Sequence, residues 1–358
     1  MPTEQPYRLA VLYSEPAPYT LACLRRLNEA HGVKILAVFW RPAEAAPFVF
    51  DTGGFIVRQY ARNELDESAM IQVLDEFKPH GLFVSGWMDK GYLRVARRVR
   101  QMGVTVVSGL DGQWYGTPRQ YVATWLGRHY LQGCFDILWV TGERQAQYAR
   151  RLGFTGARLR HGFYCCDWEH YAALYDPAVP TPAGVFLYLG RYAPEKGLSD
   201  LLAAYRAYRE QSANPWELHC VGTGPLKGLL AGQPGVRDLG FLQSDELPGV
   251  LRGAAALVLP STYEPWGVAI QEAAAAGRVL VCSDACGAAV HLLQDRYNGY
   301  LFAAGDVPAL AGCLEAVDRL SAEERRAMGR ASHELSRQFT PDRWAETMVR
   351  LMVDRVQP

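Results

Sequence analysis

The stretch Ser261-Thr-Tyr-Glu-Pro-Trp-Gly-Val-Ala-Ile-Gln-Glu-Ala-Ala-Ala-Ala-Gly277 is the segment around which the other motifs of the chain are arranged. It follows an apolar run at 256–259 that is typical of a buried strand, and its alanine-rich half predicts a helix that begins at Gly267 and ends at Gly277. Backbone N–H groups in the first turn of a helix can bind an anion such as a phosphate. The stretch therefore indicates a βα unit with an anion-binding end.

Two glutamates of this stretch differ in their predicted positions. Glu264 lies in the loop before the helix, and Glu272 lies on the helix itself. Carboxylates placed in this way could bind polar hydroxyl groups on either side of an anion. An ordinary βα unit with two solvated glutamates explains the same pattern, so the stretch alone does not identify a site.

The composition of the chain is typical of a two-domain α/β protein. Its 358 residues are 49% hydrophobic and 21% charged, and a formal net charge of zero gives no support to a nucleic-acid partner. Charged residues interrupt every apolar run, and residues 1–6 lack the pattern of a signal peptide, so we expect a cytoplasmic protein. Eight scattered cysteines without a Cys-x-x-Cys pair are expected to be reduced and predict no metal site.

Short apolar runs alternate with helical patterns along the chain, which predicts βαβ units and parallel sheets. Three prolines and a glycine within 176–184 interrupt this alternation and indicate a linker. We therefore predict an N-terminal Rossmann-like domain over 1–175, a C-terminal one over 176–340, and a C-terminal helix over 341–358. Sheets of this kind bind ligands at the carboxyl ends of their strands.

Two further loops follow predicted strands of the second domain. Leu189-Gly-Arg-Tyr-Ala-Pro-Glu-Lys-Gly197 contains Arg191 and Lys196, whose planar and compact cations suit the oxygens of a diphosphate, although two solvated cations are the alternative. Val221-Gly-Thr-Gly-Pro contains Gly222 and Gly224, where the backbone could approach a ligand. The glycine spacing in this second loop is not that of the dinucleotide fingerprint, which argues against a dehydrogenase.

Together, Gly190-Arg191, Lys196-Gly197, Gly222-Thr-Gly224-Pro and Glu264-Pro-Trp-Gly-Val-Ala-Ile-Gln-Glu272 resemble the nucleotide-sugar-binding domain of retaining glycosyltransferases of family 4. The resemblance covers about residues 185–305, and over 1–170 it rests only on length and alternation. It implies the GT-B fold, in which two Rossmann-like domains face each other across a cleft and a C-terminal helix crosses back to the first domain. It also implies a metal-independent reaction, and the chain contains no Asp-x-Asp motif.

The resemblance implies roles for individual residues. Arg191 and Lys196 would bind the donor diphosphate and stabilise the leaving group, while Glu264 would contact the donor sugar and Glu272 the nucleotide ribose. The remaining donor-binding positions that we expect on the same basis are Gly190, Gly222, Gly224, Phe241 (beside the base), Trp266, Gly267 and Val268.

The first domain is expected to supply the acceptor site. Many members of the family have a histidine after the fourth or fifth strand that contacts the donor sugar, but the matching stretch 106–115 has none. Asp111 or Gln113 could take that role, and Trp114 is a candidate for stacking on a sugar ring. Arg94, Arg97, Arg98 and Arg100 form a basic cluster that is either a solvated face or a weak peripheral contact with the inner face of a membrane.

These observations favour a retaining, metal-independent glycosyltransferase without a cofactor. We expect it to move a hexose from a UDP- or GDP-type sugar to a saccharide or lipid-linked acceptor in the synthesis of a cell-surface polysaccharide or glycoconjugate. The alternatives are a GT-B nucleotide-sugar epimerase, for which no catalytic acid or base stands out, and a non-catalytic GT-B scaffold subunit, which would be free to lose Arg191, Lys196, Glu264 and Glu272.

Overall fold

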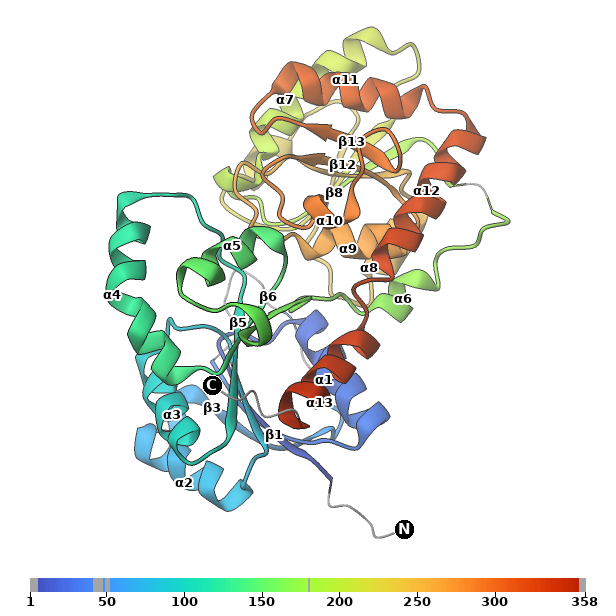
Figure 1. Ribbon diagram of the computed structural model, residues 1–358. Helices are drawn as coiled ribbons and strands as arrows, with labels where there is room; N and C mark the ends of the chain where they lie inside the picture. The colour runs from blue at the N-terminus through green and yellow to red at the C-terminus, as the bar shows by residue number, and fades with distance from the viewer. Residues whose placement is uncertain (1–5, 41–47, 49–51, 180, 354–358) are drawn as a thin grey trace. The chain divides into compact units, whose positions relative to one another are not determined.

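The computed structural model describes residues 6–40, 48, 52–179 and 181–353 of the chain. These residues form two compact units. The first unit comprises Met1–Cys165 together with Pro341–Pro358, and the second comprises Cys166–Thr340 (Figure 1). No helix among the described residues is long and apolar enough to cross a membrane.

The first unit is built on a seven-stranded sheet with the order β3-β2-β1-β4-β5-β6-β7, in which every neighbouring pair is parallel. The inner strands are buried along most of their length, because helices cover both faces of a parallel sheet. Its elements are β1 (Arg8–Tyr13), α1 (Pro18–His31), β2 (Lys34–Phe39), β3 (Ile56–Ala61), α2 (Glu67–Phe77), β4 (Gly81–Val84), α3 (Lys90–Gln101), β5 (Thr105–Leu110), α4 (Pro118–Cys134), β6 (Ile137–Val140), α5 (Glu143–Arg151), β7 (Leu159–His161) and α13 (Pro341–Val353).

Helix α13 completes the first unit although it is the last element of the chain. It packs against α1, and the two helices share an ion pair of 2.5 Å between Arg26 and Asp342 (Figure 1). The indole nitrogen of Trp344 donates a hydrogen bond of 3.0 Å to the carbonyl of Phe163. These contacts confirm the prediction that the C-terminal helix packs on the first domain.

The second unit contains a six-stranded parallel sheet with the order β10-β9-β8-β11-β12-β13. Its elements are α6 (Trp168–Ala172), β8 (Val185–Leu189), α7 (Leu198–Gln211), β9 (Glu217–Val221), β10 (Val236–Gly240), α8 (Leu247–Gly253), β11 (Ala256–Leu259), α9 (Val268–Ala275), β12 (Val279–Ser283), α10 (Ala289–Leu292), β13 (Gly299–Phe302), α11 (Val307–Asp318) and α12 (Ala322–Ser336).

The boundary between the units lies at Cys165/Cys166, whereas the proline-rich stretch had suggested 175/176. Contacts of helix α6 explain the difference. Tyr171 donates a hydrogen bond of 3.2 Å to Glu272, and the Trp168 indole donates one of 2.7 Å to the Ser336 hydroxyl. Residues 166–175 therefore belong to the second unit, and the prolines lie within that unit.

Both sheets have the doubly wound strand order expected of Rossmann-like domains. The chain reverses its direction of winding between β1 and β4 in the first unit, and between β8 and β11 in the second. In such sheets the connections on either side of this switch point leave in opposite directions and open a crevice at the strand carboxyl ends. The loops after β8 and β11 are the ones that carry Arg191, Lys196 and Glu264.

Candidate functional site

The loop after β8 holds the two cations predicted for a diphosphate. Arg191 is 54% exposed and forms an ion pair of 3.1 Å with Glu195. Lys196 lies at the end of the 3-10 helix Pro194–Lys196, and Gly197 follows with a φ of +70°. A Cβ atom on Gly197 would lie 2.1 Å from the carbonyl oxygen of Pro260, so the loop is pressed against the end of β11.

Lys196 and Glu264 form a direct ion pair between the loops on either side of the switch point. The Lys196 Nζ to Glu264 Oε2 distance is 2.5 Å, and the side chains are only 12% and 13% exposed. The carbonyl of Glu195 also accepts hydrogen bonds from the backbone N–H groups of Thr262 (2.9 Å) and Tyr263 (3.2 Å). Since a pair sheltered from water is screened less than a surface pair, this cation and carboxylate are held in place before any ligand arrives.

The loops after β8, β9 and β10 contact one another closely at glycine residues. Gly222 has a φ of +149°, and a Cβ atom there would lie 2.0 Å from the Gly190 carbonyl oxygen. At Gly224, with a φ of +150°, the Cβ atom would lie 2.6 Å from the Tyr192 carbonyl oxygen. The Gly222 N–H donates a hydrogen bond of 2.8 Å to the carbonyl oxygen of Gly240. On the side where a Cβ atom would point, these glycines are therefore packed against the neighbouring loops.

The loop before α9 begins the helix with an unusual backbone. Gly267 is the N-terminal cap of α9, with a φ of +95°, and Val268 is the first helical residue and is half-buried. Trp266 is only 2% exposed, and its ring packs against His291 and Phe339. Trp266 thus lies beneath the loop that we expected it to contribute to, and it supports that loop from the core.

Glu272 lies on α9 in an environment that disfavours its charge. Burial raises the pKa of its carboxyl group to about 7, although the hydrogen bond from the Tyr171 hydroxyl opposes this shift. Phe241, the residue expected beside the base, lies half-buried directly after β10. Tyr171 was not singled out from the sequence, because it lies 101 positions before its partner.

A cavity of about 480 Å³ lies at the switch point of the first unit. Residues after β1, β4 and β5 line it, as expected for a doubly wound sheet. Asp111 is among them, and its carboxylate accepts a hydrogen bond of 3.1 Å from the hydroxyl of Tyr164. Trp114 is not among them; its ring packs against Tyr121 and Tyr148 and lies 4.5 Å from the guanidinium of Arg151. Gln113 is buried.

Several lining residues of this cavity were not anticipated. Tyr13 is the last residue of β1, Ser14 and Glu15 follow it, and Ser85 follows β4. The order of the strands brings them together, and that order is not contained in any single motif. The available signal was their position directly after a predicted strand.

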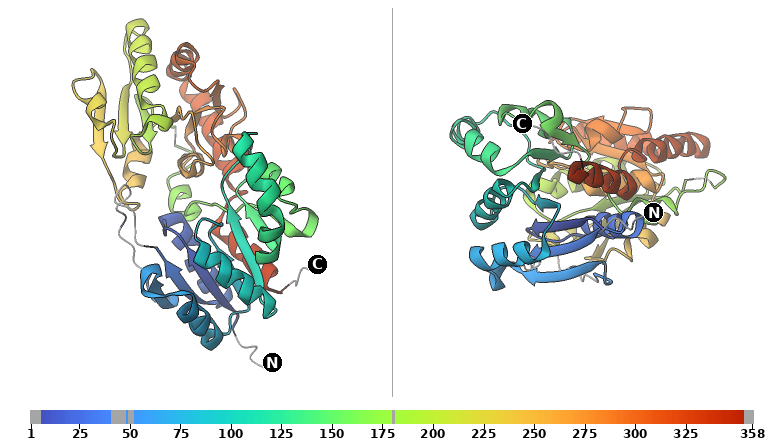
Figure 2. Two further views of the ribbon diagram at one scale, coloured as in Figure 1. Left: turned by 90° about the vertical axis from the view of Figure 1, so that its left-hand side faces the viewer. Right: turned by 60° about the horizontal axis from the view of Figure 1, so that its bottom comes forward.

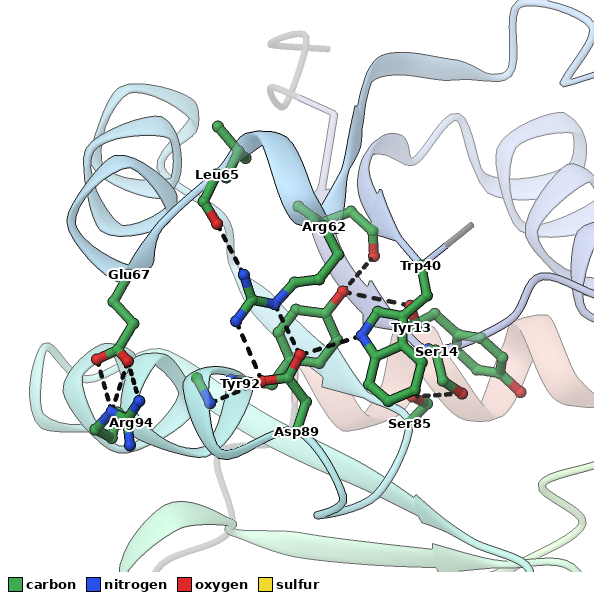
Figure 3. Close-up of polar contacts among 12 residues, drawn as sticks. Tyr13, Ser14, Trp40, Arg62, Leu65, Glu67, Ser85, Asp89, Tyr92 and Arg94 are labelled. Carbon is green, nitrogen blue, oxygen red and sulfur yellow. Dashed lines mark hydrogen bonds and ion pairs between the residues drawn. The ribbon is translucent and has the colours of Figure 1, made fainter. Parts of the chain in front are cut away.

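A partly buried ion pair between Arg62 and Asp89 lies directly after two lining residues of the cavity (Figure 3). The Asp89 side chain, 10% exposed, accepts hydrogen bonds from Arg62 Nε (2.7 Å) and Trp40 Nε1 (3.1 Å). It also caps α3 by accepting from the N–H groups of Gly91 and Tyr92. Burial alone would raise the pKa of Asp89, but these hydrogen bonds outweigh it and lower the pKa. Trp87 and Met88, which line the cavity, directly precede this anchor.

We predict that Asp89→Asn destabilises the protein by about 2 kcal/mol, because hydrogen bonds to charged groups are lost and Arg62 remains half-buried without a carboxylate. Urea denaturation measures this loss. Asp75→Asn, at an exposed position on α2, is the control and should have no effect. Because the folded-state pKa of Asp89 is lowered, its stabilisation is present above its unfolded pKa and is lost as pH falls through the folded value. Equal stability of both variants would contradict the anchoring role.

Within the part of the chain that the structure describes, no three His, Cys, Asp or Glu side chains gather in a way that could hold a metal ion.

Comparison with known proteins gives a family match in the second half of the chain. Residues 183–319 match the family described as "Glycosyl transferases group 1". Glycogen synthase of Mycobacterium tuberculosis is 36% identical over 177 residues, which are 47% of this chain and 41% of that protein. The α-D-kanosaminyltransferase of Streptomyces kanamyceticus is 27% identical over 209 residues, 54% of each. The aligned regions thus span about half or less of the length of these curated relatives.

Solved structures match over nearly the full chain. Sucrose-phosphate synthase from Thermosynechococcus elongatus has a TM-score of 0.73 at 17% identity, with 96% of this chain and 98% of that chain covered. Anabaena Alr3699/HepE, solved in complex with UDP, has a TM-score of 0.76 at 15% identity, with 97% and 99% covered. These matches confirm the GT-B fold.

Proposed function

We propose that this protein is a retaining, metal-independent glycosyltransferase that moves a hexose from a UDP- or GDP-type sugar to a saccharide acceptor. The observation that carries the proposal is the Lys196–Glu264 pair, which lies at the switch point of the second unit within a segment that matches glycosyl transferases group 1. A UDP complex of a structural neighbour supports the donor class. The finer assignment to family 4 remains part of the proposal.

The chemistry that these residues could perform is stabilisation of a leaving group. As the bond between the sugar C1 and the diphosphate oxygen breaks, negative charge develops on that oxygen. Lys196 and Arg191 are cations on the loop beside it, and positive groups fixed in advance at developing charge lower the barrier. The acceptor hydroxyl attacks C1 from the face of the sugar that the diphosphate leaves, and the hydroxyl proton passes to the departing diphosphate. Attack on this face retains the anomeric configuration of the sugar.

Glu264 keeps Lys196 oriented and offers a carboxylate to the donor sugar hydroxyls. In this role it need not be a nucleophile, and its partner at 2.5 Å is the Lys196 ammonium. Its contribution is to place a sugar and a cation side by side. Glu272 and Phe241 would hold the ribose and the base.

The raised pKa of Glu272 gives this assignment a measurable consequence. Ribose hydroxyls that donate to the carboxylate favour its charged form, so nucleotide binding should lower the pKa from about 7 and release protons. At pH 7 we expect up to about half a proton per nucleotide. Calorimetry of UDP and GDP binding in buffers of different ionisation enthalpy measures this number.

Glu272→Gln should abolish the proton release, while Glu210→Gln, at an exposed position on α7, should preserve it. In the free protein, the raised pKa means that stability is greatest below the unfolded pKa of Glu272 and falls as pH rises through about 7. Proton release that persists in Glu272→Gln would argue against ribose contact by this residue.

For the acceptor, we propose the cavity of the first unit. Glu15 and Asp111 line it, and none of its described lining residues is Lys, Arg or His. Two carboxylates without a cation favour an uncharged or cationic saccharide over a phosphorylated one, because like charges repel. A lipid-linked acceptor fits the proposal where its sugar is uncharged.

A thermal-shift screen of the intact protein against nucleoside diphosphates and their sugars tests the proposed function, since a ligand that binds the folded state raises the melting temperature. We expect a shift with UDP, GDP or one of their hexose conjugates. No shift with any of them would support a scaffold subunit. Conversion of the donor sugar to its epimer without an acceptor would support an epimerase.

The absence of a metal requirement is a separate prediction. Transfer should proceed at an unchanged rate after dialysis against EDTA, because the loop cations neutralise the diphosphate. The control is the same assay with added Mg²⁺ or Mn²⁺. A rate that falls with EDTA and returns with either ion would overturn metal independence.

A further inference from the structure

Helix α4 exposes a row of large apolar side chains. Tyr121, Val122, Trp125 and Leu126 are 56%, 58%, 74% and 64% exposed, and Tyr130 is 41% exposed. Their spacing places them along one side of the helix. In its 17 residues α4 buries only Thr124, Leu131 and Cys134. We refer to residues 121, 122, 125, 126 and 130 as the α4 face. Contiguous apolar surface of this kind indicates a binding partner.

Positive charge surrounds the α4 face. Neither α3 nor α4 contains an aspartate or a glutamate. The two helices pack side by side in the first unit (Figures 1 and 2), and the Arg97 guanidinium lies 5.8 Å from the ring centre of Tyr130. On α3, ion pairs with Glu67 and Asp136 engage Arg94 and Arg100. Four further exposed arginines form no ion pair within the described residues: Arg97, Arg98, Arg119 and Arg128.

Aromatic rings connect the α4 face with the cavity of the first unit. The ring of Tyr121 lies 4.9 Å from Trp114, and Trp114 lies 5.6 Å from Tyr148. Tyr148 lies 6.1 Å from Trp87, and both of these residues line the cavity. A surface that binds the α4 face would therefore lie next to the acceptor cavity.

We propose that the α4 face docks the protein on an anionic lipid bilayer. Trp and Tyr are favoured at the level of the lipid headgroups, and an apolar helix face flanked by arginines binds the interface of anionic membranes. A second copy of the chain is a poorer partner, because a two-fold interface would bring the same four arginines against each other. The sequence had pointed to the α3 arginines alone, whereas the structure assigns the apolar contact to α4.

Sedimentation of the intact protein with lipid vesicles tests the proposal. Binding is expected with vesicles that contain phosphatidylglycerol in phosphatidylcholine, and little with phosphatidylcholine alone. Trp125→Ser/Leu126→Ser should weaken binding about tenfold or more, because apolar area no longer enters the interface. Arg119→Gln/Arg128→Gln should weaken it about fivefold per arginine and reduce its dependence on salt.

The matched control is Val290→Ser/Tyr297→Ser, which removes two side chains of the second unit that are 50% and 58% exposed. It should bind as the unmodified protein does. Thermal melting checks that each variant is folded, and the arginine variant tests the proposal independently of the apolar one. Equal binding to neutral and anionic vesicles, or unchanged binding by both α4 variants, would overturn it. So would a dimer in light scattering that Trp125→Ser/Leu126→Ser dissociates, without any binding to vesicles.

Discussion

Lys196→Ala is expected to reduce the rate of sugar transfer by about 10³-fold, because a positive group fixed at the leaving diphosphate is lost. The effect should appear in kcat as well as in kcat/KM, since the charge that Lys196 stabilises develops fully only in the transition state. Steady-state kinetics with the donor identified by thermal shift measures both constants. The control is Lys34→Ala, at an exposed position at the start of β2, which should leave both unchanged.

The Lys196→Ala experiment must separate a loss of transfer from a loss of stability. Lys196 neutralises a sheltered carboxylate, so its removal leaves Glu264 without its partner and should also lower stability. Comparison of Lys196→Ala/Glu264→Gln with Glu264→Gln alone separates the two effects, because the neutral amide no longer needs a cation and both variants lack the same carboxylate. We expect the double variant to recover stability but not transfer. If transfer returned with stability, Lys196 would act only as a structural partner of Glu264.

Gly222→Ala is expected to lower the free energy of unfolding of the second unit by about 3 kcal/mol. Two causes add. An L-residue is strained at a φ of +149°, and its Cβ would lie 2.0 Å from the Gly190 carbonyl oxygen, so the loops after β8 and β9 must separate. Because Gly190 directly precedes Arg191, donor binding should weaken as well. Urea denaturation and nucleotide thermal shifts measure the two effects.

Gly228→Ala provides the matched control in the same connection. It lies in the 3-10 helix Lys227–Leu230, and a Cβ atom there would meet no atom within 4 Å. This variant should be within about 0.5 kcal/mol of the unmodified protein. If Gly222→Ala were equally harmless, the loops would be free to move apart, and the contact between Gly190 and Gly222 would not fix the site.

The alternation of strands and helices was sufficient to predict two domains with parallel sheets, and the family resemblance added the GT-B fold. Apolar runs such as 256–259 are local signals, and the doubly wound order of both sheets agrees with what they predicted. The boundary between the domains was predicted less well. It depends on where α6 packs, and packing against a helix one hundred residues later leaves no local trace in the sequence.

The candidate site was likewise predicted where a local sequence signal exists and missed where packing between distant residues decides. The sequence identified Lys196 and Glu264 because each follows a strand, but their direct pairing depends on the strand order that places β8 next to β11. Trp266 was expected at the donor site on the basis of the resemblance, and only the positions of His291 and Phe339 reveal that it is buried. Gly222 and Gly224 were assigned to ligand approach, and the structure shows in addition that a Cβ atom on either would meet backbone atoms of an adjacent loop.

The return of α13 to the first unit has a consequence for the order in which the protein is made. The second unit is continuous in sequence from Cys166 to Thr340, so it can fold as soon as that stretch has left the ribosome. The first unit is complete only later, because the segment from Pro341 that packs against α1 is synthesised after the second unit. The surface of α1 that α13 covers therefore stays uncovered until α13 has been synthesised, after the whole of the second unit.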